Sequence, residues 1–205
     1  MKRFYFLCTL LVLGIVGIYA QKGSSTYVDK KGVLRWTKGN AEVSEFGVHY
    51  ALPFEDAYKQ FAILNLPYEK GVEDDVYHLT RLGLKAFRLH LWDSEITDTL
   101  GNLVQNNHLH LVDYTISEMK KRGFKIIITP LTYYGTSEKP YGLGQKYGKK
   151  YSYTPECIAA TKRYLKQIME HVNSYTGVAY KYEPDIIGFE LYNEPWHQNF
   201  TDEMV

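Results

Sequence analysis

The sequence predicts a parallel α/β fold, and three observations lead to that prediction. Short apolar segments alternate with amphipathic segments along most of the chain, which is the order of strands and helices in α/β proteins. Several short segments are apolar at nearly every position, as parallel strands buried on both faces are. Two stretches also repeat one pattern forty residues apart, in which a helix ends at Gly83 or Gly123 and a short turn leads into a strand.

Residues 1–20 are expected to form a secretory signal peptide. Lys2 and Arg3 precede an apolar stretch, and Ala20 stands where the sequence turns polar. A membrane anchor is the alternative, but the apolar stretch is slightly shorter than the roughly 20 residues that span a bilayer. We therefore expect an exported protein (secreted, periplasmic or at the cell surface) without stable membrane insertion after cleavage.

The folded part is expected to follow a linker at residues 21–26 and to occupy residues 27–205. Alternating residues around a Lys-Gly turn predict a β-hairpin over residues 27–36. The first core strand is predicted at 45–50 and the second at 86–92, with a helix between them. The apolar stripe of that helix recurs about every 3.6 residues and consists of Val72, Val76, Leu79 and Leu82.

The same alternation continues through the second half of the chain. A polar loop is predicted at 93–107, and a helix then leads to a third strand at 125–131. A long loop rich in Gly, Tyr and Lys follows at 132–154, and another helix leads to a fourth strand at 186–192. The predicted core faces of these two helices are Leu109, Val112, Ile116 and Met119, and then Ile158, Leu165, Ile168 and Val172.

Four such units in series leave two architectures open, a doubly wound sheet and a (β/α)8 barrel. A complete barrel typically needs about 250 residues, whereas the fourth strand is predicted to end near residue 192 of 205. The chain would then supply only the first half of a barrel, with about four βα units after the hairpin. Because such a half leaves open sheet edges, which natural proteins avoid, we expect the sequence to be truncated after strand four.

Composition and charge exclude several classes of function. Hydrophobic residues make up 45% of the chain and charged residues 23%, which is typical of a globular domain and not of a disordered chain. The 24 Lys and Arg are balanced by 23 Asp and Glu, so a nucleic-acid partner is disfavoured. His108 and His110 have no further ligand near them in sequence, and we predict no metal site.

The sharpest signal for chemistry is the end of the fourth strand. Asn193 and Glu194 stand there, where parallel α/β folds place catalytic groups. Between Tyr192 and Trp196 the carboxyl of Glu194 is expected to be partly desolvated. Desolvation raises the pKa of a carboxyl group and suits it to act as a general acid. The alternative reading of Glu194 is a surface carboxylate or a helix cap.

The second strand presents a polar face. Strand alternation puts Arg88, His90 and Trp92 on one side, opposite three apolar residues. An Arg that points into a barrel needs a partner, and a carboxylate is the natural one. Arg88 is therefore expected either to support a catalytic carboxylate or to form a structural ion pair.

In these features the sequence resembles the retaining glycosidases of glycoside hydrolase clan A, most closely the family 5-like (β/α)8 barrels of the cellulase and mannanase type. The resemblance covers roughly residues 27–197. It is carried by four motifs in their expected places, which are GVLRW at 32–36, FGVHY at 46–50, RLH at 88–90 and NEP at 193–195.

The resemblance implies a retaining hydrolase of a β-linked polysaccharide or oligosaccharide that needs no cofactor. In the family, the Glu of NEP is the acid/base, the Asn before it holds the sugar 2-hydroxyl, and the strand-two Arg supports the carboxylates. These roles map onto Glu194, Asn193 and Arg88. The nucleophile of the family comes from strand seven, which this chain does not reach, so the 205-residue chain alone should be inactive.

Glu190 is a poor substitute for that nucleophile. Retaining enzymes need their two carboxyl groups about 5 to 5.5 Å apart. Glu190 precedes Glu194 by four positions on the same strand, which corresponds to roughly 13 Å along the chain.

The residues expected to bind the sugar are His49, His90, Trp92, Tyr133, Tyr134 and Trp196. The aromatic side chains can stack on pyranose rings, and packing at the barrel rim is the alternative for each. His49 stands where relatives often carry Asn, and Tyr133 and Tyr134 stand where many carry His, so the sugar is left open. A non-catalytic carbohydrate-binding barrel, which would lack the second carboxylate, is the alternative function.

Overall fold

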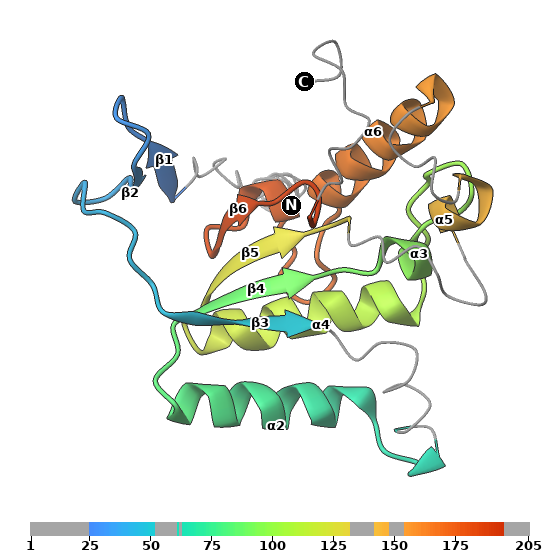
Figure 1. The fold of residues 1–205 in the computed structure, drawn as a ribbon. Helices are drawn as coiled ribbons and strands as arrows, with labels where there is room; N and C mark the ends of the chain where they lie inside the picture. The colour runs from blue at the N-terminus through green and yellow to red at the C-terminus, as the bar shows by residue number, and fades with distance from the viewer. Residues whose placement is uncertain (1–24, 52–60, 62, 132–141, 148–153, 195–205) are drawn as a thin grey trace, which may run out of the picture.

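The computed structural model describes residues 25–51, 61, 63–131, 142–147 and 154–194. Four parallel strands form one sheet, in the order β3 (Gly47–Ala51), β4 (Ala86–His90), β5 (Lys125–Thr129) and β6 (Ile186–Phe189) (Figure 1). The spatial order of the strands follows the chain order without a reversal. A doubly wound sheet reverses its order at a switch point, whereas a barrel does not, so the predicted half-barrel is confirmed.

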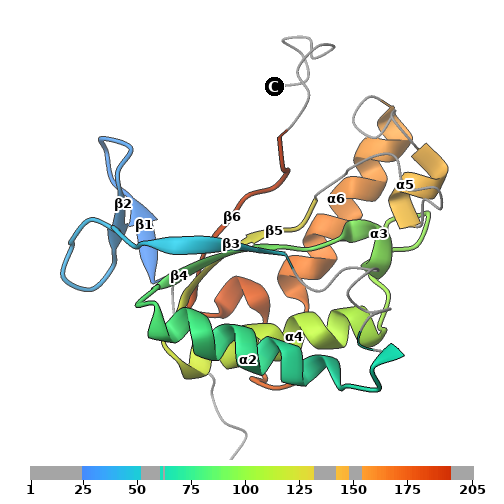
Figure 2. The ribbon, with the colours of Figure 1, turned by 60° about the horizontal axis from the view of Figure 1, so that its bottom comes forward.

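Two helices cover one face of this sheet. Helix α2 (Tyr68–Arg81) and helix α4 (Asn107–Lys121) lie side by side against it, as Figure 2 shows. Both helices are followed by a glycine in the left-handed region, with φ of 77° at Gly83 and 76° at Gly123. A residue without Cβ adopts this conformation at little cost. The repeated helix–Gly–strand pattern of the sequence is thus a repeated structural unit.

Helix α6 (Pro155–Glu170) corrects one predicted core face. Its start follows the usual chemistry, since Thr154 caps the helix by accepting from Cys157 N at 3.2 Å and Pro155 fills the first turn. Two of the four predicted residues are wrong, because the prediction counted only large aliphatic residues: Ile158 and Val172 are 36% and 54% exposed, whereas Ile168 is buried as predicted, together with a Tyr and two small residues. The buried face consists of Cys157, Ala160, Tyr164 and Ile168.

The predicted loops contain short elements. Helix α3 (Asp93–Ile96) opens the 93–107 segment, and helix α5 (Gly142–Tyr147) lies within the 132–154 segment. A 3-10 turn, η2 (Tyr180–Tyr182), precedes β6.

The strands β4, β5 and β6 end two or three residues before their predicted ends. Backbone hydrogen bonds nevertheless continue past those ends, from Leu91 N to Thr129 O at 3.0 Å and from Glu190 N to Ile128 O at 2.8 Å. Asn193 N likewise donates to Leu131 O at 2.8 Å. The segments that follow the strands are therefore held to the sheet by its own hydrogen-bond pattern.

The predicted hairpin is present, with β1 (Thr26–Val28) antiparallel to β2 (Leu34–Trp36). Asp29 organises its turn by accepting from the backbone N–H groups of Lys31 and Val33 at 2.8 and 3.0 Å. The hairpin lies at the amino ends of the core strands (Figure 1), where the Thr26 hydroxyl donates to Ile187 O at 3.1 Å.

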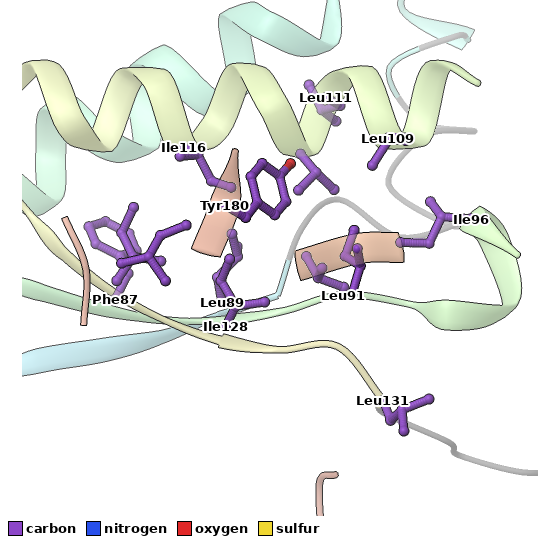
Figure 3. Close-up of a cluster of buried hydrophobic side chains, with 14 of the residues drawn as sticks. Phe87, Leu89, Leu91, Ile96, Leu109, Leu111, Ile116, Ile128, Leu131 and Tyr180 are labelled. Atoms are coloured by element: carbon purple, nitrogen blue, oxygen red, sulfur yellow. The ribbon is translucent and has the colours of Figure 1, made fainter. Parts of the chain in front are cut away.

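The core fills the space between the sheet and the helices (Figure 3). Phe87, Leu89 and Ile128 of the sheet are fully buried against Leu109 and Ile116 of α4. The opposite face of the sheet is different. Side chains there alternate with the core residues and are polar or partly exposed. In the described part of the chain, no helix has both the length and the apolar character that a membrane span requires.

Candidate active site

Polar side chains from three core strands and from the segment after β6 meet on the face of the sheet that the helices do not cover. The strand register brings them together, because His49 of β3 pairs with Arg88 of β4, and His90 of β4 pairs with Thr129 of β5. In the parallel sheet these positions lie toward the carboxyl ends of the strands, where active sites of (β/α)8 barrels are built. We call the following residues the Arg88 cluster: His49, Arg88, Thr129, Glu190 and Asn193.

Arg88 is the centre of this cluster. Its Nε and Nη2 atoms lie 2.7 and 2.5 Å from Oε2 of Glu190, which forms an ion pair. Nη2 also donates to Oδ1 of Asn193 at 2.9 Å, and Nη1 contacts Nδ1 of His49 at 3.1 Å. The guanidinium therefore joins β3, β4 and the segment after β6.

Glu190 is held as an anion. Its burial alone would raise its pKa, but the Thr129 hydroxyl, which donates to Oε2 at 2.6 Å, and the Arg88 guanidinium together lower the pKa below its ordinary value. The side chains of Arg88 and Glu190 keep 31% and 38% of their surface exposed, so solvent screens this pair in part.

His49 and His90 form a pair of uncharged rings. Their ring centroids lie 3.9 Å apart with a tilt of 57°. Burial is the main cause that lowers the pKa of His90 to about 4, to which the neighbouring His49 and Arg88 add, and burial together with Arg88 lowers the pKa of His49. His90 is only 2% exposed, and its Nε2 atom has no hydrogen-bond partner among the described residues. That buried nitrogen is a group for which a ligand hydroxyl would be a suitable partner.

Glu194 stands beside the cluster and is exposed to solvent, so the described structure does not show the partial desolvation that the sequence predicts for it. Its backbone has φ of 45°, in the left-handed region that few residues other than Gly, Asn and Asp adopt. Such a conformation costs of order 1–3 kcal/mol and is common at active sites. Asn193, directly before it, is 6% exposed and is fixed by both Leu131 O and Arg88. The exposed carboxylate thus follows a firmly anchored amide.

The geometry changes the expected role of Arg88 in one respect. Among the described residues, the carboxylate that Arg88 holds is Glu190, not Glu194. The pairing of Glu190 with Arg88 and Thr129 was not predicted from the sequence, where Glu190 is considered only as a replacement nucleophile. One signal was available, because strand alternation places Glu190 on the same side of the sheet as Arg88.

The predicted sugar-binding residues divide into two groups. His49 and His90 lie together next to Arg88, and Trp92 lies just beyond β4, half-buried, where its carbonyl accepts from Glu95 N at 3.0 Å. Tyr133, Tyr134 and Trp196 lie outside the described residues. The described ranges gather no group of three or more His, Cys, Asp or Glu that could hold a metal ion.

Comparison with known proteins identifies relatives of this architecture. A mannan endo-1,4-beta-mannosidase 3 from Arabidopsis thaliana is 34% identical over 93 residues, which are 41% of this chain and 22% of that protein. An endo-1,4-beta-mannanase from Rhizomucor miehei superposes with a TM-score of 0.57 at 21% identity, over 78% of this chain and 46% of that chain. A glycoside hydrolase family 5 mannosidase from the same organism gives 0.56 at 12% identity, over 85% and 49%. No family model matches the chain.

The chain spans about half the length of these two solved structures, and its match covers less than a quarter of the plant enzyme. The structural likeness establishes the fold, and the match to the plant enzyme adds similarity in sequence. The resemblance that the four motifs predicted is therefore confirmed: this chain is similar to about half of a family 5-like (β/α)8-barrel glycoside hydrolase.

Proposed function

We propose that the complete protein is a retaining β-glycoside hydrolase that acts on a β-1,4-linked mannan or on oligosaccharides derived from it. The observation that carries this proposal is the Arg88 cluster, which anchors Asn193 directly before an exposed Glu194 at the carboxyl end of the sheet. The mannan substrate is suggested by the activity named for the plant and fungal relatives.

In this mechanism Glu194 is the general acid/base. It protonates the glycosidic oxygen as the bond to the leaving group breaks, and it then takes a proton from the water that hydrolyses the glycosyl-enzyme intermediate. Asn193 holds a hydroxyl of the sugar next to the reacting carbon. No cofactor takes part in this chemistry.

The nucleophile is proposed to be a carboxylate from strand seven of the complete barrel, outside this chain. Glu190 is unsuited to the role because its Oε2 accepts from Thr129 and from two nitrogens of Arg88. Hydrogen bonds and an ion pair that stabilise a carboxylate lower its pKa and reduce its basicity. Glu190 is therefore a stable anion in the ground state and not an activated nucleophile.

The remaining contacts to sugar are proposed to come from neutral and aromatic groups. His49 and His90 offer uncharged ring nitrogens on the polar side of the sheet. Trp92, Tyr133, Tyr134 and Trp196 are proposed as stacking surfaces for pyranose rings.

The test is hydrolysis of β-1,4-mannan by the complete protein. Proton NMR of the first product is expected to show a β-anomer, which is the outcome of retention. Glu194→Gln is expected to lower kcat by about 10²- to 10⁴-fold without abolishing binding. An inverted product would contradict the retaining mechanism, and binding without any hydrolysis by the wild-type protein would favour the carbohydrate-binding alternative.

Export is proposed separately, because residues 1–20 lie outside the described part. Expression in a secreting host is expected to yield a mature protein that begins at Gln21, which N-terminal mass spectrometry would check. A mature protein that retains residues 1–20 in the membrane fraction would support the anchor instead.

A further inference from the structure

We propose that Glu190 is the positioning residue of this site, which holds the Arg88 guanidinium in place so that Arg88 in turn fixes His49 and Asn193. Glu190 would touch neither the substrate nor the reacting atoms, and would act only through Arg88. The effect of Glu190 on catalysis rests on the proposed function. The contacts by which Glu190 positions Arg88 do not depend on that function.

Three hydrogen-bond donors converge on one carboxylate oxygen of Glu190. Oε2 of Glu190 accepts from Arg88 Nε at 2.7 Å, lies 2.5 Å from Arg88 Nη2 and accepts from the Thr129 hydroxyl at 2.6 Å. These donors come from β4 and β5, whereas Glu190 directly follows β6. The backbone of Glu190 is also fixed, because its N–H donates to Ile128 O at 2.8 Å. Hydrogen bonds to β4 and β5 thus hold both the carboxylate and the backbone of Glu190 in place.

The rigid shape of the Arg88 guanidinium links its contact with Glu190 to its contacts with other residues. Arginine presents five N–H groups in a rigid planar fork, so an anchor on its Nε edge also sets the direction of the other nitrogens. With Nε and Nη2 on Glu190, Nη2 reaches Oδ1 of Asn193 at 2.9 Å and Nη1 reaches Nδ1 of His49 at 3.1 Å. Both outer contacts therefore depend on the anchor at Glu190.

The contacts of Arg88 also determine the proton position on His49 and the amide orientation of Asn193. Arginine only donates hydrogen bonds, so Nδ1 of His49 must accept, and the proton of the neutral ring is placed on Nε2. Asn193 likewise accepts through Oδ1, which turns its amide NH₂ group away from Arg88. Glu190 would in this way determine which atoms of His49 and Asn193 offer donors to a sugar.

A purely electrostatic role for Glu190 makes the opposite prediction from a positioning role. The charge of Glu190 raises the pKa of His49, whereas Arg88 lowers it. If Glu190 contributed only its charge, its removal would lower the pKa of His49. If Glu190 positions Arg88, its removal releases the guanidinium, and the pKa of His49 rises toward its ordinary value.

The experiment is an NMR titration of ¹⁵N-histidine-labelled complete protein carrying Glu190→Ala. We expect the His49 titration to move upward by a measurable fraction of a pH unit and its ring to change from one tautomer to a mixture. Thr129→Val is the second variant, because it removes one donor to Glu190 and changes no charge. It is expected to move the titration in the same direction by a smaller amount. A His49 titration that stays in place or moves downward in Glu190→Ala would overturn the proposal.

Glu118→Gln is the matched control. Glu118 is also a carboxylate whose pKa is lowered by cationic partners, and it accepts from Arg122 at 3.0 Å at the far end of α4. Glu118→Gln is expected to leave the His49 titration unchanged.

In the mannan assay, Glu190→Ala is expected to lower kcat by about 10²-fold, as a misplacement of about 1 Å does, with KM little changed. If the wild-type protein hydrolyses no mannan, the proposed function fails, while the titration still decides the positioning role.

Discussion

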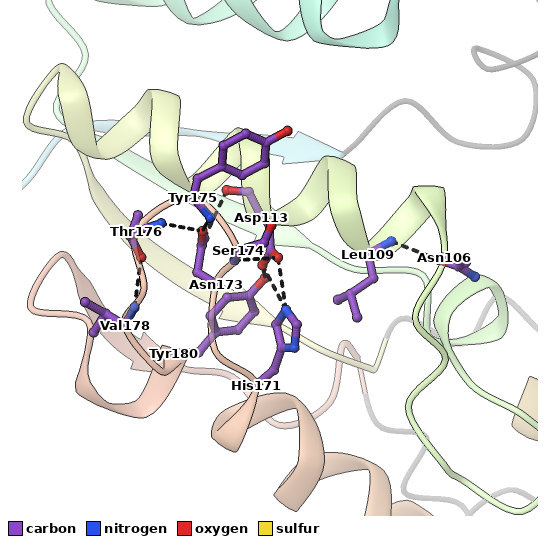
Figure 4. A network of polar contacts seen from close by, with 10 residues as sticks. All are labelled: Asn106, Leu109, Asp113, His171, Asn173, Ser174, Tyr175, Thr176, Val178 and Tyr180. Atoms are coloured by element: carbon purple, nitrogen blue, oxygen red, sulfur yellow. Dashed lines mark hydrogen bonds and ion pairs between the residues drawn. The ribbon is translucent and has the colours of Figure 1, made fainter.

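Two clusters in this molecule use the same chemical groups, a carboxylate, a histidine and a hydroxyl, in two different environments. The Arg88 cluster lies on the side of the sheet that the helices leave uncovered, and its carboxylate is 38% exposed. The second cluster surrounds Asp113 of α4, which is 2% exposed (Figure 4). We call it the Asp113 cluster, and its members are Asp113, His171, Asn173, Ser174 and Tyr180.

Every oxygen of Asp113 has a partner. Its Oδ1 accepts from the Tyr180 hydroxyl at 2.6 Å, its Oδ2 accepts from Ser174 N at 2.9 Å, and Nε2 of His171 lies 3.0 and 3.1 Å from the two oxygens. The side chain of Asn173 donates to the backbone carbonyl of Asp113 at 3.0 Å. The cluster thus ties α4 to the whole segment between α6 and β6.

The polar groups in and next to the Arg88 cluster are less completely hydrogen-bonded. Three contacts meet on Oε2 of Glu190, while Nε2 of the neighbouring His90 is buried without a partner among the described residues. Glu194 adds a backbone conformation that is costly for a Glu. The contrast teaches that satisfied polar groups fasten the fold, whereas unsatisfied groups and strain mark the place where a ligand is expected.

The largest expected effect is the loss of Asp113. Asp113→Ala would leave the buried Tyr180 hydroxyl and the partly buried Ser174 N–H without their acceptor, and breaking such a network typically costs about 3 kcal/mol or more. Urea denaturation of the complete protein at pH 7 measures this cost. A loss below about 1 kcal/mol would show that the Asp113 cluster does not fasten the fold.

The pH dependence of stability is a second test of whether the Asp113 cluster stabilises the fold. Burial tends to raise the pKa of Asp113, but His171, Tyr180 and Ser174 N lower it below its ordinary value. A carboxyl whose pKa is lowered by folding contributes stability above the pKa of the unfolded chain, about 3.9. That contribution disappears as the pH falls through the lower, folded pKa. The difference in unfolding free energy between wild type and Asp113→Ala is therefore expected to shrink as the pH falls below about 4.

The order of helices and strands could be predicted from sequence because each depends on neighbours along the chain. The 3.6-residue stripe at Val72 and Val76 and the left-handed glycines at 83 and 123 are local signals. The face of α6 could not be predicted as reliably, because Tyr164 is buried through a hydrogen bond to Pro130 O at 2.9 Å, a contact between distant segments. Hydrophobicity alone predicted Leu165 and Ile168 correctly but added the exposed Ile158 and Val172 to that face.

In the candidate site, too, local features could be predicted from the sequence but contacts between distant segments could not. Asn193 and Glu194 could be found from a motif at a strand end, and Arg88 and His90 from alternation along one strand. The partnership of Arg88 with Glu190 joins residues 102 positions apart and depends on the register of β4, β5 and β6. Spacing along one strand gives only the separation of Glu190 from Glu194. It carries no information on which neighbouring strand supplies the partner.

The two histidines provide a test with opposite signs. His171→Leu is expected to destabilise the complete protein by about 1–2 kcal/mol, because Asp113 loses a partner while it stays buried. His90→Leu is expected to stabilise it by about 1 kcal/mol, because it removes a buried nitrogen that has no partner among the described residues. Thermal unfolding of both variants compares them directly. A destabilising His90→Leu would show that His90 is satisfied in the complete barrel.

The smallest expected effect on stability is that of Glu190→Gln. The Arg88–Glu190 pair is partly exposed on both sides, and such pairs contribute about 0.5 kcal/mol or less after solvent screening. Asp113→Asn is the matched change at the buried cluster, where the same replacement of one oxygen by an NH₂ group takes the acceptor away from either the Tyr180 hydroxyl or the Ser174 N–H. Urea denaturation is expected to separate the two variants by about 2 kcal/mol. Equal losses would mean that Glu190 is as structural as Asp113, and the uncovered side of the sheet would then lose its distinction from the core.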